Sequence, residues 1–220
     1  EHHAVLDPLD WLAKDEQAEV ELIGVDHDAR LDVDAFRHAI EREPESVALV
    51  TIMLANNEVG TVQPVAELAE ICHAHGIPIH TDAVQAVGQL EVDFAALGVD
   101  ALTLTGHKVG GPFGVGALVV RRDLGLTALL HGGGQERDIR SGTLDTPAIV
   151  GFSRALELAV ERQPVVGPNL AARRQHLIDA VRAVVPDAVA NGDPVNRLPG
   201  NAHLTFPGCE GDALLMLLDA

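Results

Sequence analysis

The sequence has few cysteines, few basic residues and no long apolar run. Its two cysteines, Cys72 and Cys209, are too few for a disulfide framework, which agrees with a reducing compartment. Only 15 lysines and arginines stand against 33 acidic residues, and the formal net charge of -18 disfavours binding to nucleic acid and anionic membranes. Apolar runs such as 47–54 are far shorter than the roughly 20 residues that span a bilayer, and the first residues do not resemble a signal segment. We therefore expect a soluble, cytoplasmic protein without direct nucleic-acid binding or membrane attachment.

The residues that are present favour a folded α/β protein. With 47% hydrophobic residues among 220, the chain can bury one sizeable core. Helical spacing of apolar residues alternates with short apolar, β-branched runs, which is typical of a mostly parallel sheet with helices on both faces. The expected elements are helices at 31–42, 64–75 and 94–97 and strands at 46–54, 76–82 and 100–105. Asn56, Asp82 and Thr105 then fall at or just after strand ends, where the sites of such sheets gather.

The second half of the sequence predicts a change of domain. The expected elements are a strand at 117–121, a helix from Thr146 to about Arg162, a helix at 170–184 and a strand at 202–206. Pro164 and Pro168 predict a break between the two helices. We expect residues 1–163 to form a large domain whose N-terminal part is missing, and residues 164–220 to form part of a smaller α+β domain.

A lysine directly follows the strand at 100–105. Gly106-His107-Lys108 stands between this strand and the glycine-rich stretch 110–116, which predicts that the lysine ammonium lies in a crevice. Lysine normally titrates near ~10.4, and burial or a cationic neighbour such as His107 makes it a nucleophile that can form an imine. Taken alone, a lysine at a strand end is more often a solvated charge.

Asp82 ends the strand at 76–82 and provides a partner for such a lysine. A carboxylate buried at a strand end is costly unless a positive group neutralises it. A protonated pyridine nitrogen is such a group, and a Schiff-base lysine combined with an aspartate on the ring nitrogen is typical of pyridoxal-phosphate enzymes. Taken alone, Asp82 would more often be a helix N-cap.

Four segments carry this chemistry in chain order. They are LANNEVG (54–60), HTDAVQ (80–85), TGHKVGGP (105–112) and HGGGQER continuing to RSGT (131–143). In order and spacing they resemble the motifs of cysteine desulfurases of the NifS/IscS type, which are class V aminotransferase-like enzymes of fold type I. The resemblance implies a pyridoxal 5'-phosphate enzyme that converts L-cysteine to L-alanine and an enzyme persulfide. It also implies a sulfur-acceptor or scaffold protein as partner, in iron–sulfur cluster assembly or tRNA thiolation.

The resemblance implies catalytic roles for Lys108 and His2 and a cofactor-binding role for Asp82. Lys108 matches the lysine that binds the cofactor as an imine, and Asp82 matches the carboxylate that keeps the pyridine nitrogen protonated. His2 matches the histidine that stacks on the ring and moves protons. A histidine at the edge of the chain is equally typical of a frayed surface residue.

Five further residues match ligands of the cofactor. Asn57 and Gln85 match residues that hydrogen-bond the ring oxygen. Thr105 and His107 match a serine and a histidine that hold the phosphate, and threonine keeps the hydroxyl of the serine. Thr143 matches a phosphate ligand that reaches across a dimer interface, so the resemblance implies a homodimer.

The sequence also lacks parts of the family pattern. The catalytic cysteine of the family lies in a Ser/Gly-rich loop that does not occur before Ala220, and Cys209, in the turn FPGCEG, does not match it. A phosphate-binding loop upstream of Glu1 and a later carboxylate-binding arginine are also missing. We therefore expect a piece of a longer protein that is inactive by itself. A related pyridoxal-phosphate aminotransferase, a selenocysteine lyase and a non-catalytic fragment are the alternatives.

Two other patterns have different interpretations. Cys72-His73-Ala-His75 contains metal-binding residue types, but residues 72 and 73 point apart on the expected helix, so we expect no metal site. The stretch 110–116 precedes a strand rather than a helix, which disagrees with a dinucleotide-binding fingerprint. Close backbone packing behind Lys108 is the expected role of its glycines.

Overall fold

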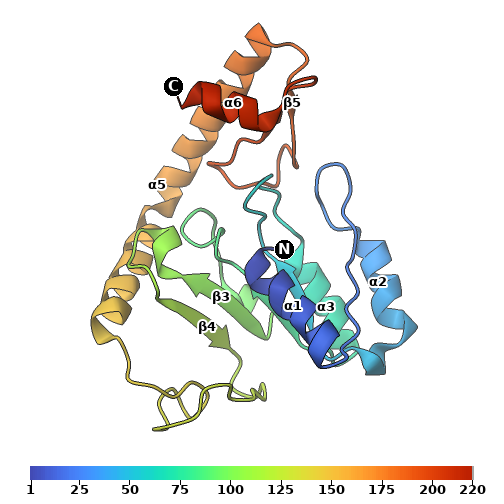
Figure 1. Ribbon diagram of the computed structural model, residues 1–220, viewed down its shortest axis with the longest axis vertical. Helices are drawn as coiled ribbons and strands as arrows, with labels where there is room; N and C mark the ends of the chain where they lie inside the picture. The colour runs from blue at the N-terminus through green and yellow to red at the C-terminus, as the bar shows by residue number, and fades with distance from the viewer. Residues whose placement is uncertain (220) are drawn as a thin grey trace.

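The computed structural model describes residues 1–219 and has an α/β fold (Figure 1). Its main sheet has the strand order β1-β2-β3-β4, formed by Val50–Met53, Ile79–Asp82, Ala101–Thr105 and Gly116–Val120. The first three strands are parallel, and β4 pairs with β3 in the antiparallel direction. The expected α/β fold with a mostly parallel sheet is therefore confirmed.

Three helices pack together beside this sheet. α3 (Val65–Ala74) contacts both α2 (Val33–Arg42) and α4 (Phe94–Leu97). Asp32 and Asp93 cap α2 and α4, because each carboxylate accepts two N–H groups of the first helical turn. The side chains of α3 and β2 form the centre of the hydrophobic core, and the most deeply buried of them are Val65, Leu68, Cys72 and Ile79.

The remaining elements lie mostly outside this core. They are α1 (His3–Asp15), the 3-10 helices η1 (Pro44–Ser46) and η2 (Gly106–Val109), α5 (Thr146–Val184), the two-stranded antiparallel pair β5 (Val189–Ala190) and β6 (Leu204–Thr205), and α6 (Gly211–Leu218). Of these, α6 and β5 lie away from the sheet, beside the far end of α5 (Figure 1). The short helix η2 follows β3 directly and packs against α5. Among residues 1–219, no helix combines the length and the apolar character that crossing a membrane requires.

The expected helix break at Pro164 and Pro168 is wrong, because α5 continues through both prolines. Each proline removes one helical N–H and crowds the preceding turn, which favours a break on local grounds. Tertiary contacts offset this cost in the structure. Phe152 of α5 is buried in the core, and Gln163 Nε2 donates to the Gln89 carbonyl at 3.3 Å. The division of the chain into two domains stays a prediction.

Candidate active site at the carboxyl end of the sheet

The carboxyl end of β2 holds a buried carboxylate. Asp82 is the last residue of β2 and only 7% exposed. Its Oδ1 accepts the Val84 N–H at 2.9 Å, which starts the turn that follows the strand. Among the described residues, no lysine, arginine or histidine side chain forms an ion pair with Asp82. Because a buried carboxylate without a cation is unfavourable, this position suits a positively charged group of a ligand.

Glycines allow the chain to fold tightly behind Lys108, which lies in η2. The Gly106 N–H donates to the Val115 carbonyl and the Gly111 N–H donates to the Gly106 carbonyl, each at 2.8 Å. A Cβ atom on Gly106 would lie 2.7 Å from the Pro112 carbonyl oxygen, and one on Gly111 would lie 3.0 Å from the Gly106 oxygen. Within the stretch 110–116, the expected close backbone packing is confirmed at Gly111 and at Gly116, where a Cβ atom would lie 2.8 Å from the Leu104 carbonyl oxygen. A Cβ atom on Gly110 or Gly114 would instead meet open space. Gly106 adds a close approach that was not predicted.

The side chain of Lys108 is exposed, so the expectation that it lies in a crevice is wrong for the described residues. The end of β3 determines where this lysine stands. Whether the Lys108 side chain is enclosed depends on which other segments pack over the end of β3, and the residues around Lys108 do not specify those segments. The exposed amine remains accessible to a carbonyl group of a ligand.

A hydroxyl and an imidazole lie next to Lys108. Thr105 Oγ1 donates to the Val115 carbonyl at 3.2 Å and lies 3.2 Å from His107 Nδ1. Since the hydroxyl has one proton, the contact with His107 requires the ring Nδ1 as donor. The His107 ring stacks on Phe113, with centroids 6.1 Å apart and an angle of 18° between the planes. Sequence reasoning missed Phe113, although an aromatic residue so close to Lys108, in a chain with 3% aromatics, was a usable signal.

Three amide side chains at this end have two different roles. Asn56 Oδ1 accepts the N–H groups of Glu58 and Val59, each at 2.9 Å, so this side chain shapes its own turn. The half-buried side chains of Asn57 and Gln85 form no hydrogen bond with another described residue. Their amide groups are therefore available to a ligand.

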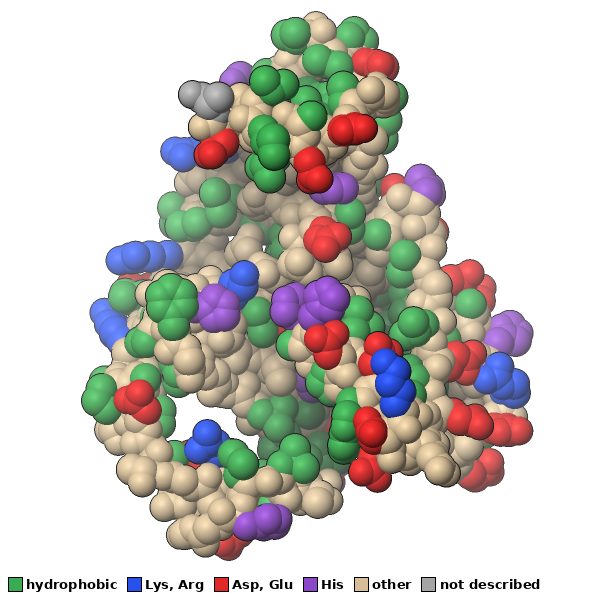
Figure 2. Space-filling view, viewed as in Figure 1, with side chains coloured by type: hydrophobic (Ala, Val, Ile, Leu, Met, Phe, Trp, Pro, Cys, Tyr) green, Lys and Arg blue, Asp and Glu red, His purple; other side chains and the backbone are tan. Residues whose placement is uncertain are grey.

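The first residues lie at the same end of the sheet. Glu1 Oε1 accepts the N–H of Met53, the last residue of β1, at 2.7 Å. Burial raises the pKa of Glu1 and the negative charge of Asp82 raises it further, although the bond from Met53 opposes the shift. The exposed His2 caps α1, since its Nδ1 accepts the Ala4 N–H at 3.0 Å, which leaves the proton on Nε2. Histidine side chains gather in the middle of the face shown in Figure 2.

Thr143 is not brought together with the other predicted residues. β4 runs antiparallel to β3, so Val120 lies beside Ala101 at the beginning of β3. The loop that follows β4 therefore starts at the end of the sheet opposite to Lys108, and Figure 1 shows it extending below the sheet. Thr143 is exposed in this loop. The side chain of Thr143 is therefore available to a ligand or to another chain.

Another polar cluster lies at the amino end of the sheet. Asp100 accepts His73 Nε2 at 2.9 Å, Arg121 Nη1 at 2.7 Å and the Ile79 N–H at 2.8 Å. Burial alone would raise the pKa of Asp100, but the bonds from Ile79 and His73 and the charge of Arg121 hold it below its ordinary value. Three of these side chains line an open hollow of about 510 Å³. None of the predicted site residues lines this hollow.

Neither cysteine belongs to the candidate site. Cys72 is fully buried, and burial together with the charge of Asp100 raises the pKa of its thiol to about 12. This thiol therefore stays protonated and unreactive. Cys209 is exposed in the turn after β6. No group of three His, Cys, Asp or Glu side chains suited to a metal ion occurs within residues 1–219.

Comparisons with known proteins extend the resemblance to the whole chain. The family model described as "Aminotransferase class-V" matches residues 1–220. An IscS-like cysteine desulfurase of Mycobacterium tuberculosis is 50% identical, over 100% of this chain and 56% of its own length. A cysteine desulfurase IscS of Clostridium botulinum is 41% identical, over 100% of this chain and 55% of its own length. A solved structure of a NifS-like protein matches with a TM-score of 0.93 and 34% identity, over 100% of this chain and 59% of that chain.

These matches confirm both the fold class and the family resemblance found in the motifs. The chain spans about half the length of the curated relatives it matches, 56% and 55% for the two named above.

Proposed function

We propose that this chain, which belongs to the aminotransferase class-V family, acts as a cysteine desulfurase. The substrate is L-cysteine, the carbon–sulfur bond breaks, and L-alanine leaves while a cysteine thiol of the enzyme becomes a persulfide. One observation of the structure carries the proposal. The buried carboxylate of Asp82 and the amine of Lys108 stand at the carboxyl ends of two neighbouring parallel strands, β2 and β3.

The residues at this end fit pyridoxal 5'-phosphate, the cofactor of the family. Asp82 is buried without a cationic partner among the described residues, and a protonated pyridine nitrogen supplies the missing positive charge. The unpaired amides of Asn57 and Gln85 suit the ring oxygen. The Thr105 hydroxyl and the His107 imidazole lie beside Lys108 and suit the phosphate, since each could donate to it once the Thr105 proton turns from the Val115 carbonyl and the ring proton of His107 from Thr105.

Each residue then has a defined task. When bound, the cofactor supplies a ring that withdraws electrons from the substrate α-carbon. Lys108 holds the cofactor covalently through Nζ and afterwards moves the proton at the substrate α-carbon. Asp82 keeps the proton on the ring nitrogen, because its carboxylate favours the charged form. His2, with its proton on Nε2, moves a proton at the cofactor carbon.

We also propose that the protein is a cytoplasmic homodimer. The exposed position of Thr143 supports a phosphate contact from one copy to the other. The acceptor of the persulfide sulfur is a partner or scaffold protein in iron–sulfur cluster assembly or tRNA thiolation.

The proposed reaction is tested by its product. Because neither Cys72 nor Cys209 matches the catalytic cysteine of the family, the test uses protein expressed from the complete gene. It is loaded with cofactor and incubated with L-cysteine and a thiol reductant, and L-alanine and sulfide are measured over time. We expect alanine and sulfide in equal amounts and at many turnovers, and none from the Lys108→Ala variant. A 2-oxo acid in place of alanine would identify an aminotransferase, and a preference for L-selenocysteine would identify a selenocysteine lyase. A loaded protein that forms no alanine contradicts the proposal.

A further inference from the structure

A segment far along the sequence covers the turn that carries Asn57. This turn comprises residues 56–60, directly after β1. Residues 191–201, which we name the strap, lie between β5 and β6 in the C-terminal part of the chain. The strap and the turn are separated by more than a hundred residues, so their contact is a product of the fold alone.

Backbone hydrogen bonds join the strap to the end of the turn. The Leu198 N–H donates to the Gly60 carbonyl at 2.8 Å, and the Val62 N–H donates to the Asn196 carbonyl at 2.8 Å. These bonds have the pattern of a short antiparallel bridge. The strap therefore pairs with the end of the turn as an added strand would, and these hydrogen bonds restrict how far the turn can move.

The strap and the turn approach so closely that only glycine fits at two positions. Gly60 has a φ of 83°, and a Cβ atom there would lie 2.7 Å from Asn201 Oδ1. Gly192 has a φ of 82°, and a Cβ atom there would lie 2.5 Å from the Val59 carbonyl oxygen. Both a left-handed backbone and the lack of space require glycine on each side of the contact.

A buried arginine fills the contact. Arg197 is 7% exposed, and its Nη2 donates to the carbonyls of Val59 at 3.0 Å and Asn201 at 3.2 Å. Burial lowers the pKa of Arg197, the charge of Arg174 lowers it further, and the charge of Asp193 partly opposes both effects. A buried cation held mainly by carbonyl oxygens is costly in isolation. The bonds of Arg197 link Val59 of the turn to Asn201 of the strap.

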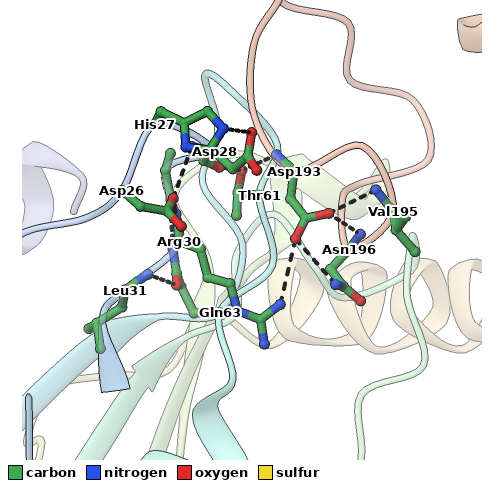
Figure 3. A network of polar contacts seen from close by, with 11 residues as sticks. Asp26, His27, Asp28, Arg30, Leu31, Thr61, Gln63, Asp193, Val195 and Asn196 are labelled. Carbon is green, nitrogen blue, oxygen red and sulfur yellow. Dashed lines mark hydrogen bonds and ion pairs between the residues drawn. The ribbon is translucent and has the colours of Figure 1, made fainter. Parts of the chain in front are cut away.

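A polar network also ties the strap to the loop before α2 (Figure 3). The Asp193 N–H donates to Thr61 Oγ1 at 3.0 Å, and this fully buried hydroxyl donates to the Asp28 carbonyl at 2.6 Å. Arg30 Nη1 lies 3.5 Å from Asp193 Oδ2. The strap is thus bonded on its other side as well.

One strap side chain reaches the turn at Asn57 itself. Asn201 Nδ2 donates to the Glu58 carbonyl at 2.8 Å and to the Asn57 carbonyl at 3.3 Å. Its Oδ1 accepts Arg197 Nη2 at 3.3 Å, which orients the amide toward the turn. The half-buried Asn57 side chain forms no hydrogen bond with another described residue, so the backbone that Asn201 holds determines where that side chain lies.

We propose that Asn201 is a positioning residue that holds Asn57 ready for the cofactor, an inference that rests on the proposed function. Asn201 does not touch the cofactor. It acts through the two carbonyls of the turn, so its loss leaves the Asn57 amide present but no longer fixed.

The first test measures the turn without cofactor. Amide hydrogen exchange of residues 58–60 is compared in the cofactor-free protein and its Asn201→Ala and Asn201→Asp variants. Asn201→Asp keeps the side-chain shape and the contact with Arg197 but removes the donor, so it remains informative if Asn201→Ala folds poorly. Since two neutral hydrogen bonds are lost, we expect exchange to be between about 5-fold and 30-fold faster in both variants.

The matched control is Asn191→Ala. The Asn191 amide bonds His203 Nδ1 at 3.1 Å and Thr205 Oγ1 at 2.8 Å, both within the C-terminal part of the chain. This variant should leave the exchange of residues 58–60 unchanged. Equal exchange in the Asn191 and Asn201 variants overturns the proposal.

The second test is a double-mutant cycle on the dissociation constant of pyridoxal phosphate. Asn201→Ala should weaken binding by about 5-fold or more in the wild-type background but by less than about 2-fold when Asn57 is already alanine. If Asn201→Ala weakens pyridoxal phosphate binding by the same factor in both backgrounds, its effect is a general destabilisation and the proposal is overturned. If Asn201→Ala leaves binding unchanged, the proposal is overturned as well. If the exchange result holds but the wild-type protein binds no pyridoxal phosphate, the proposed function fails and Asn201 is only a structural residue.

Discussion

Replacing Gly106 by alanine tests whether close backbone packing positions Lys108. The new Cβ atom would lie 2.7 Å from the Pro112 carbonyl oxygen and 2.9 Å from Val115 Cγ1. The Val115 carbonyl is fixed as well, because it accepts the Gly106 N–H at 2.8 Å and the Thr105 hydroxyl at 3.2 Å. The loop behind Lys108 must therefore shift to admit one methyl group.

The size of this effect follows from general values for overpacked sites. Overpacking costs about 1–3 kcal/mol, and 1 kcal/mol lowers the melting temperature of a chain of this size by about 2–4 °C. We therefore expect Gly106→Ala to melt roughly 2–12 °C lower than the wild type in differential scanning calorimetry. We also expect less pyridoxyl labelling of Lys108 after borohydride reduction, since the η2 turn is displaced.

The matched control for this change is Gly125→Ala. A Cβ atom at Gly125 has no other heavy atom within 4 Å, so this variant adds the same methyl group to open space. Its melting temperature and labelling should equal those of the wild type. If Gly106→Ala behaves like Gly125→Ala in both measurements, the packing behind Lys108 does not position it.

Three further outcomes follow from the structure. Asp82→Asn should keep the melting temperature within a few degrees while turnover falls about 10-fold or more, because a nearby carboxylate changes a partner's pKa by about 1–3 units; near-normal turnover refutes this role. The folded pKa of Asp100 is lowered, so its stabilisation is present above the unfolded pKa near ~3.9 and is lost as pH falls through the folded value. Asp100→Asn should therefore lower stability at pH 7 by about 1–3 kcal/mol in urea titrations and reduce the loss of stability below pH ~4, whereas an unchanged acid profile disproves the linkage. Iodoacetamide should alkylate the exposed Cys209 in the native protein and Cys72 only after unfolding, as read by peptide mass mapping; native labelling of Cys72 contradicts its burial.

The parts that sequence reasoning predicted correctly depend on local patterns. The apolar, β-branched run that ends at Asp82 and the run that ends at Thr105 became β2 and β3 in the structure. Lys108 follows β3 by three residues, so its place at the carboxyl end of the sheet is a consequence of the strand alone. The short helix α4 begins after the N-cap residue Asp93 and ends at Gly98, which has a left-handed backbone conformation. Both are local signals.

The features that sequence reasoning missed depend on contacts between distant segments. The prolines of α5 predicted a break, but burial of Phe152 and the bond from Gln163 to the Gln89 carbonyl keep the helix continuous. Asn201 stands in a polar loop with no periodic pattern, and only the fold brings its amide to the Asn57 turn. The exposure of Lys108 likewise depends on which segments pack above β3.

The identity of the lysine that binds pyridoxal phosphate tests the central claim most directly. Protein loaded with the cofactor is reduced with borohydride and digested, and the pyridoxyl group is located by peptide mass mapping. The account predicts a single label on Lys108, the residue that follows β3 in η2. A label on Lys14, the other lysine of the chain, or the absence of any label on Lys108 in a protein that has bound the cofactor, contradicts the account.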